Sequence, residues 1–62
     1  MWVVKDNGNA VDDVTGDEFY YELHSDGLVR VYKNHRPIYF CGNVADAQEF
    51  IKKLVEDLNN EE

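Results

Sequence analysis

The sequence contains a single cysteine, Cys41, and therefore cannot form a disulfide bond within the chain. A chain of 62 residues buries only about 60% of the surface that it exposes when unfolded, so its hydrophobic core is small. Natural domains of this size are often stabilised by disulfides, a metal or a partner subunit. Since the internal disulfide is excluded, stability must come from close packing or from association with another chain.

Export and membrane signals are also missing from the sequence. Residues 1–10 lack the basic segment, the apolar run and the small-residue cleavage site of a signal peptide. No apolar run approaches the ~18 residues that a membrane-spanning helix needs. A lone thiol without an export signal is typical of a reducing compartment. We therefore expect a cytoplasmic protein that has no membrane partner.

Positive charge is scarce. Six Lys and Arg residues stand against 13 Asp and Glu residues, which gives a net charge of −7. Residues 28–41 depart from this balance, because they contain Arg30, Lys33 and Arg36 and no acid. Phosphates would be repelled over most of the surface, so nucleic acid is not expected as the main partner. An array of carboxylates can itself imitate a phosphate backbone, and an acidic nucleic-acid mimic is one alternative function.

The C-terminal third predicts one amphipathic helix over residues 44–58. Its apolar residues recur at spacings of three and four and so lie on one face: Val44, Ala47, Phe50, Ile51, Leu54, Val55 and Leu58. Asn43 is suited to cap the N-terminus of this helix, and Asp46 lies in the first turn, where the helix dipole favours an acid. Residues 59–62 are predicted to be a frayed acidic tail.

Residues 18–41 predict an antiparallel β-meander. Residues 18–24 alternate between two faces, and Ser25-Asp26-Gly27 fits a three-residue hairpin loop with its glycine in the left-handed conformation. This loop pairs Leu23 with Val29. A two-residue loop would instead turn an acidic side chain onto the core face, because a shift of one residue reverses every side chain.

A second hairpin loop is predicted at Asn34-His35, since both residues tolerate a positive φ better than most. This loop pairs Val31 with Ile38 and Val29 with Phe40. The two hairpins then agree on a single core face. That face consists of Phe19, Tyr21, Leu23, Val29, Val31, Ile38 and Phe40.

The N-terminal segment, residues 1–17, predicts a strand near residues 2–5, a turn at Asn7-Gly8 and an acidic loop. Whether its first strand joins the main sheet stays open. Residues 1–62 are thus predicted to form a single α+β domain, in which an antiparallel meander of three to four strands carries one C-terminal helix on one face. The side chains of Phe50 and Leu54 are expected to be buried against the sheet.

The sheet face away from the helix is the predicted functional surface. It carries Tyr20, Glu22, His24, Leu28, Arg30, Tyr32, Pro37, Tyr39 and Cys41. Tyrosine and arginine are enriched at protein interfaces, and exposed apolar patches commonly mark contact sites. We therefore expect a non-enzymatic protein-interaction domain that self-associates, as a homodimer, through Tyr20, Arg30, Tyr32 and Tyr39. A solvated face whose aromatic residues merely favour strand formation is the structural alternative.

A nucleic-acid-binding module is the functional alternative, because basic residues alternate with Tyr32 and Tyr39 on the second hairpin. No ribonucleoprotein-type motif accompanies them, and Lys and Arg on an edge hairpin also discourage strand aggregation.

His24 and Cys41 are predicted to lie ~10 Å apart, too far for a nucleophile and its base. A calcium-binding loop that started at Asp13 would need glycine at its sixth position and glutamate at its twelfth, where the sequence has Glu18 and His24. No catalytic residue, metal or cofactor is therefore expected.

Overall fold

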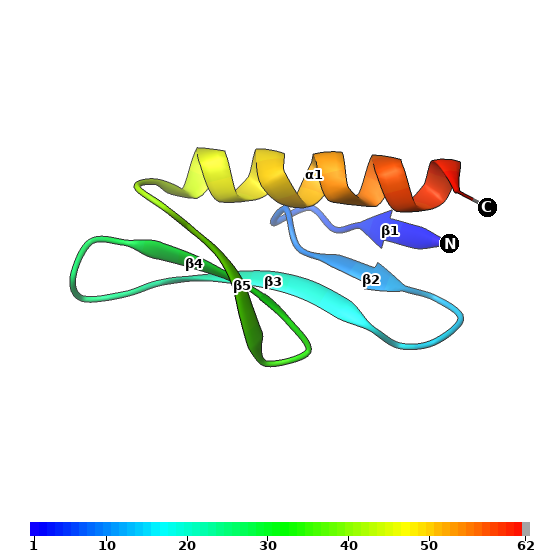
Figure 1. The fold of residues 1–62 in the computed structure, drawn as a ribbon, viewed down its shortest axis with the longest axis horizontal. Helices are drawn as coiled ribbons and strands as arrows, with labels where there is room; N and C mark the ends of the chain where they lie inside the picture. Colours follow the sequence, from blue (N-terminus) through cyan, green and yellow to red (C-terminus); the bar gives the residue numbers. More distant parts are fainter. Residues whose placement is uncertain (62) are drawn as a thin grey trace.

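The computed structural model describes residues 1–61, and within this range the chain forms five strands followed by one helix (Figure 1). The elements are β1 (Trp2–Val4), β2 (Ala10–Asp12), β3 (Glu18–Leu23), β4 (Val29–Lys33), β5 (Arg36–Cys41) and α1 (Val44–Asn60). The strands form one antiparallel sheet in chain order, and α1 covers one of its faces. The predicted α+β class is confirmed, although the sheet of the described chain has five strands rather than three or four.

The N-terminal hairpin joins the main sheet, which the sequence pattern left open. Its turn closes with a bond from the Lys5 N–H to the Asn9 carbonyl (2.7 Å), and Gly8 adopts the left-handed conformation with φ 94°. β2 then pairs with β3, with Ala10 opposite Phe19. The indole of Trp2 stacks on the ring of Phe19 at a centroid distance of 4.4 Å, so the hairpin brings a large aromatic side chain into the core.

The β3–β4 hairpin has the predicted loop and the predicted register. The Gly27 N–H donates to the His24 carbonyl at 3.0 Å, and Gly27 has a φ of 83°. Leu23 lies opposite Val29, as expected. Leu23 was also predicted to be a core residue, but it ends β3 and is 67% exposed.

The β4–β5 hairpin has the predicted turn but not the predicted register. Asn34 and His35 both have a positive φ, of 50° and 76°. Beyond the turn, a β-bulge adds one residue to β5, so that Val31 lies opposite Tyr39 rather than Ile38. The predicted pairing of Val29 with Phe40 is wrong for the same reason, because Val29 lies opposite Cys41. A bulge shifts all later pairs by one residue and thereby exchanges the two faces of the strand.

The consequence for β5 is that Tyr39 and Cys41 face the helix, while Phe40 faces away from it. Tyr39 stacks on Phe50 of α1, with the ring planes parallel and the centroids 4.1 Å apart. Cys41 is half-buried and packs against the core. Phe40, by contrast, is 58% exposed. The predictions that Phe40 is a core residue and that Tyr39 lies on the uncovered face are therefore both wrong.

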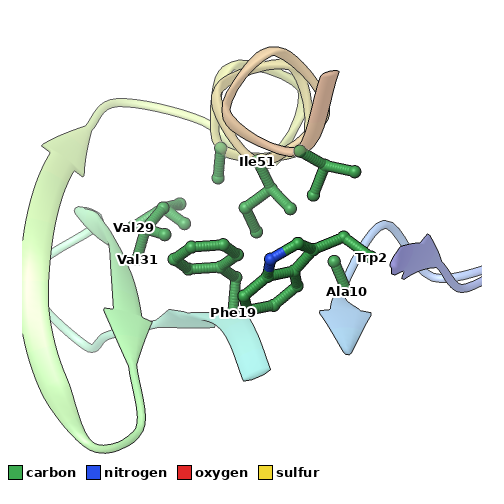
Figure 2. Close-up of a cluster of buried hydrophobic side chains, with 8 residues drawn as sticks. Trp2, Ala10, Phe19, Val29, Val31 and Ile51 are labelled. Carbon is green, nitrogen blue, oxygen red and sulfur yellow. The ribbon is translucent and has the colours of Figure 1, made fainter. Parts of the chain in front are cut away.

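The core lies between α1 and the sheet, as Figure 2 shows. Among residues 1–61 the buried apolar side chains are Trp2, Ala10, Phe19, Val29, Val31, Ala47, Ile51 and Val55. Ile51 points from the helix towards the rings of Trp2 and Phe19 (Figure 2). Phe50 and Leu54, which were predicted to be buried, pack on the edge of this core and are half-buried.

The helix begins where predicted and ends later. The Asn43 side chain accepts a bond from the Asp46 N–H at 2.8 Å, which confirms the cap at the N-terminus. The helix continues to Asn60, beyond the predicted end at residue 58. Residues 59 and 60 are therefore helical and not frayed, whereas Glu62 of the predicted tail lies outside the described residues. Within the described chain, no helix is long and apolar enough to cross a membrane.

Candidate interaction surface

The meander β3–β5 leaves one of its faces without a covering element (Figure 1). We call this the outer face and define it by the strand residues, and those flanking them, that point away from α1. They are Tyr20, Glu22, His24, Leu28, Arg30, Tyr32, Pro37 and Phe40. Cross-strand pairing arranges six of these residues in two rows. The first row is Tyr20, Tyr32 and Pro37, and the second is Glu22, Arg30 and Phe40.

The first row is built around a tyrosine pair. The rings of Tyr20 and Tyr32 stack with their centroids 5.2 Å apart. A histidine holds each hydroxyl group: the Tyr20 oxygen is 3.1 Å from His35 Nδ1, and the Tyr32 oxygen is 3.2 Å from His24 Nε2. Desolvation is the largest cause, and the negative charge of Glu22 the next, of a pKa of Tyr20 that is raised above its ordinary value of 10.0. Both rings are thus fixed in place, which lowers the entropy that they would lose in a contact.

The second row has a cation at its centre. Arg30 lies opposite Glu22 on β3 and Phe40 on β5. Its guanidinium group donates to Asp26 Oδ2 at 3.1 Å and lies 5.8 Å from the centroid of the Phe40 ring. The backbone N–H of Leu28, and then the charge of Arg30, lower the pKa of Asp26 below its ordinary value of 3.8. Arg30 is therefore oriented by its neighbours, and its side chain remains 27% exposed.

Three of the four predicted contact residues share this face, and the fourth does not. Tyr20, Arg30 and Tyr32 lie together, whereas Tyr39 is on the helix side of the sheet. Phe40 takes the place that the prediction gave to Tyr39. One signal in the sequence could have found it: Pro37 cannot complete a regular strand ladder, and bulges are common on edge strands near such a residue.

The basic residues that suggested nucleic-acid binding, Arg30, Lys33 and Arg36, do not form a continuous strip. Arg30 and Lys33 are three positions apart on β4 and so project from opposite faces of the sheet. Lys33 lies opposite Arg36 at the base of the hairpin, while Arg30 is engaged by Asp26. The three cations therefore do not form one groove that could follow a phosphate backbone.

His24 and Cys41 lie on opposite faces of the sheet. His24 contacts the Tyr32 hydroxyl on the outer face. The Cys41 thiol, on the helix side, donates to the carbonyl of Asn43 at 3.3 Å. The imidazole is thus not placed to deprotonate the thiol. In the part of the chain that the structure describes, no three His, Cys, Asp or Glu side chains gather as metal ligands.

Both edges of the sheet carry features that oppose pairing with another strand. At β1, the Asn59 side chain accepts from the Trp2 N–H at 2.9 Å and donates to the Trp2 carbonyl at 3.1 Å. At β5, Pro37 lacks an N–H group and the bulge interrupts the ladder. Association by edge-to-edge strand pairing is therefore disfavoured, which leaves the outer face as the surface of the meander to consider.

Fold and surface together define a small two-layer α+β domain that has one sheet face covered by a helix and the other left open. Comparisons with models of known protein families, with curated protein sequences and with solved structures find no match in any of the three.

Proposed function

We propose that this chain is a non-enzymatic protein-interaction domain that self-associates through its outer face. One observation carries the proposal: Phe40, a large apolar side chain, is 58% exposed beside Arg30, on the same face as the stacked tyrosines. Leu28, 44% exposed, extends the apolar part of the same face. Rigid aromatic side chains and arginine are the residues that most often dominate the energy of protein interfaces.

A second copy of the chain is a partner that would also stabilise the folded domain. Eight residues form the buried apolar core of the described chain, and neither a disulfide nor a described metal cluster supplements it. Binding that occurs only in the folded state adds directly to the free energy of unfolding. Burial of Phe40 and the tyrosine rings in a dimer would supply this free energy.

Sedimentation of the wild-type chain, of Tyr32→Glu and of Val14→Glu tests the proposal. Val14→Glu is the matched control, because Val14 is an apolar residue in the β2–β3 loop, 82% exposed and not part of the outer face. We expect a dimer for the wild type and the control, and a monomer for Tyr32→Glu. The melting temperature should depend on protein concentration only in the two dimeric proteins.

A wild-type chain that sediments as a monomer at ~100 µM, well above a typical micromolar dissociation constant, would contradict self-association.

Salt distinguishes this function from binding of nucleic acid. Dimerisation of two chains of charge −7 should persist or strengthen at high salt, which screens their repulsion. Binding to phosphates should collapse under the same conditions.

A further inference from the structure

We infer that the partner on the outer face is a second copy related by a two-fold axis that runs along the strands, midway between β3 and β4. The inference rests on the proposed function and specifies its geometry. Its basis is the cross-strand pairing of the outer face, where Glu22 lies opposite Arg30 and Tyr20 lies opposite Tyr32.

Such an axis exchanges β3 and β4 between the two copies. When the outer faces stack, β3 of one copy lies over β4 of the other. Each residue of β3 then contacts a β4 residue of the second copy. That β4 residue is the one with the same number as its cross-strand neighbour within its own sheet. Glu22 therefore meets Arg30 of the second copy, and Tyr20 meets Tyr32 of the second copy. Because the axis generates every contact twice, one dimer contains two such ion pairs and two such tyrosine contacts.

The side chains suit this arrangement. Stacked sheets lie about 10 Å apart, a gap that a glutamate and an arginine extended towards each other can span. The Glu22 side chain is 54% exposed, and its carboxylate, which lies 4.0 Å from His24 Nε2, can reach across the interface. Arg30 uses one nitrogen for Asp26, and a guanidinium group has five N–H donors, so donors remain for a second carboxylate.

Charge favours this axis over two alternatives. A two-fold axis along β4 itself would place Arg30 over Arg30 of the second copy, and an axis across the strands at this row would do the same. Both arrangements set like charges against each other in a desolvated interface, which is costly. The axis between β3 and β4 is the one that turns the neighbouring opposite charges of a single chain into attraction between chains.

A charge-exchange experiment tests the axis. We expect Glu22→Arg and Arg30→Glu each to weaken self-association by at least about tenfold, since each sets like charges together at two places. An equimolar mixture of the two variants should recover the dimer as a heterodimer, which native mass spectrometry separates by mass. Each single variant also sets like charges side by side within its own chain, and mixing does not remove that repulsion. Recovery of the dimer on mixing therefore reports contacts between chains.

A double variant, Glu22→Arg with Arg30→Glu, covers the case in which a single variant fails to fold. It keeps opposite charges as neighbours in each chain and should dimerise like the wild type. The double variant has the same mass as the wild type, so one of them is isotope-labelled before mixing; the two should not dimerise with each other, because every interchain pair would then join like charges. Circular dichroism checks the fold of each protein.

Two different failures can be told apart. A wild-type dimer that Tyr32→Glu abolishes supports the proposed function. If, in addition, the single variants do not form a heterodimer on mixing, or the double variant dimerises with the wild type, the axis is wrong and the proposed function stands. If the wild type is monomeric, the proposed function and the axis both fail.

Discussion

Asn59, in the last turn of α1, binds the backbone of Trp2 as a neighbouring strand would. Its Oδ1 accepts from the Trp2 N–H at 2.9 Å, and its Nδ2 donates to the Trp2 carbonyl at 3.1 Å. The two residues are 57 positions apart, so this contact ties the first strand to the last turn of the helix. It also occupies backbone groups that the β1 edge would otherwise offer to another chain.

We predict that Asn59→Ala lowers the free energy of unfolding by about 1–3 kcal/mol, because it leaves two partly buried backbone groups without partners. Asn60→Ala is the matched control, since it makes the same change at an exposed helical position next to it. Its effect should stay within about 0.5 kcal/mol. Urea unfolding followed by the fluorescence of Trp2 measures both. Equal stabilities of the two variants would show that the Asn59 contact contributes nothing.

A second prediction concerns Gly8, where the β1–β2 turn approaches α1. Gly8 has a positive φ of 94°, and a Cβ atom there would lie 2.6 Å from Cγ of Gln48. Gln48 cannot move away freely, because its Nε2 donates to the Asn7 carbonyl at 3.0 Å. Gly16 has a similar φ of 80°, but a Cβ atom there would meet no described atom within 4 Å.

Gly16→Ala should therefore cost about 1–2 kcal/mol for the left-handed backbone alone. Gly8→Ala should cost roughly 1 kcal/mol more, since it must also displace Gln48 from its hydrogen bond. In a Gln48→Ala background, the cost of Gly8→Ala should fall to that of Gly16→Ala. Chemical unfolding of the four variants gives these differences, and a Gly8→Ala cost that does not depend on Gln48 would contradict the prediction.

A third prediction concerns pH. The pKa of Asp26 is lowered in the folded protein, first by the Leu28 N–H and further by Arg30. When a folded-state pKa is depressed, the unfolded chain takes up the proton first as the pH falls. The stabilisation by Asp26 is thus fully present above the unfolded pKa of roughly 4, and it is lost as the pH falls through the lower, folded value.

Asp26→Asn isolates the charge, because an amide oxygen can still accept from the Leu28 N–H. The wild type should be more stable than this variant by a constant amount at pH 5 to 7, and the difference should shrink below roughly pH 4. Thermal unfolding at low protein concentration, which keeps association from contributing, provides the test. A stability difference that stays constant down to about pH 2 would argue against a depressed pKa of Asp26.

Sequence reasoning succeeded where the signal was local. Asn43 caps the helix because its side chain and the Asp46 N–H are three residues apart, and Gly27 closes its hairpin because it accepts a φ of 83°. The β3–β4 register followed from that loop. The same reasoning failed on β5, because Ile38, Tyr39, Phe40 and Cys41 are consecutive apolar residues. Both alternating sets in this run are apolar, so the pattern could not say which set the helix covers.

For the candidate surface, the sequence by itself determined the tyrosine pair and the Glu22–Arg30 pair, because a short loop fixes which residues of two adjoining strands face each other. Tertiary structure alone decided three further features: the position of the β5 bulge, which Pro37 favours but does not place, the packing of Trp2 on Phe19, and the bond of Asn59 to Trp2. Each of these depends on how α1 and the sheet fill the space between them. That packing is a property of side chains distant in the sequence, and no local pattern encodes it.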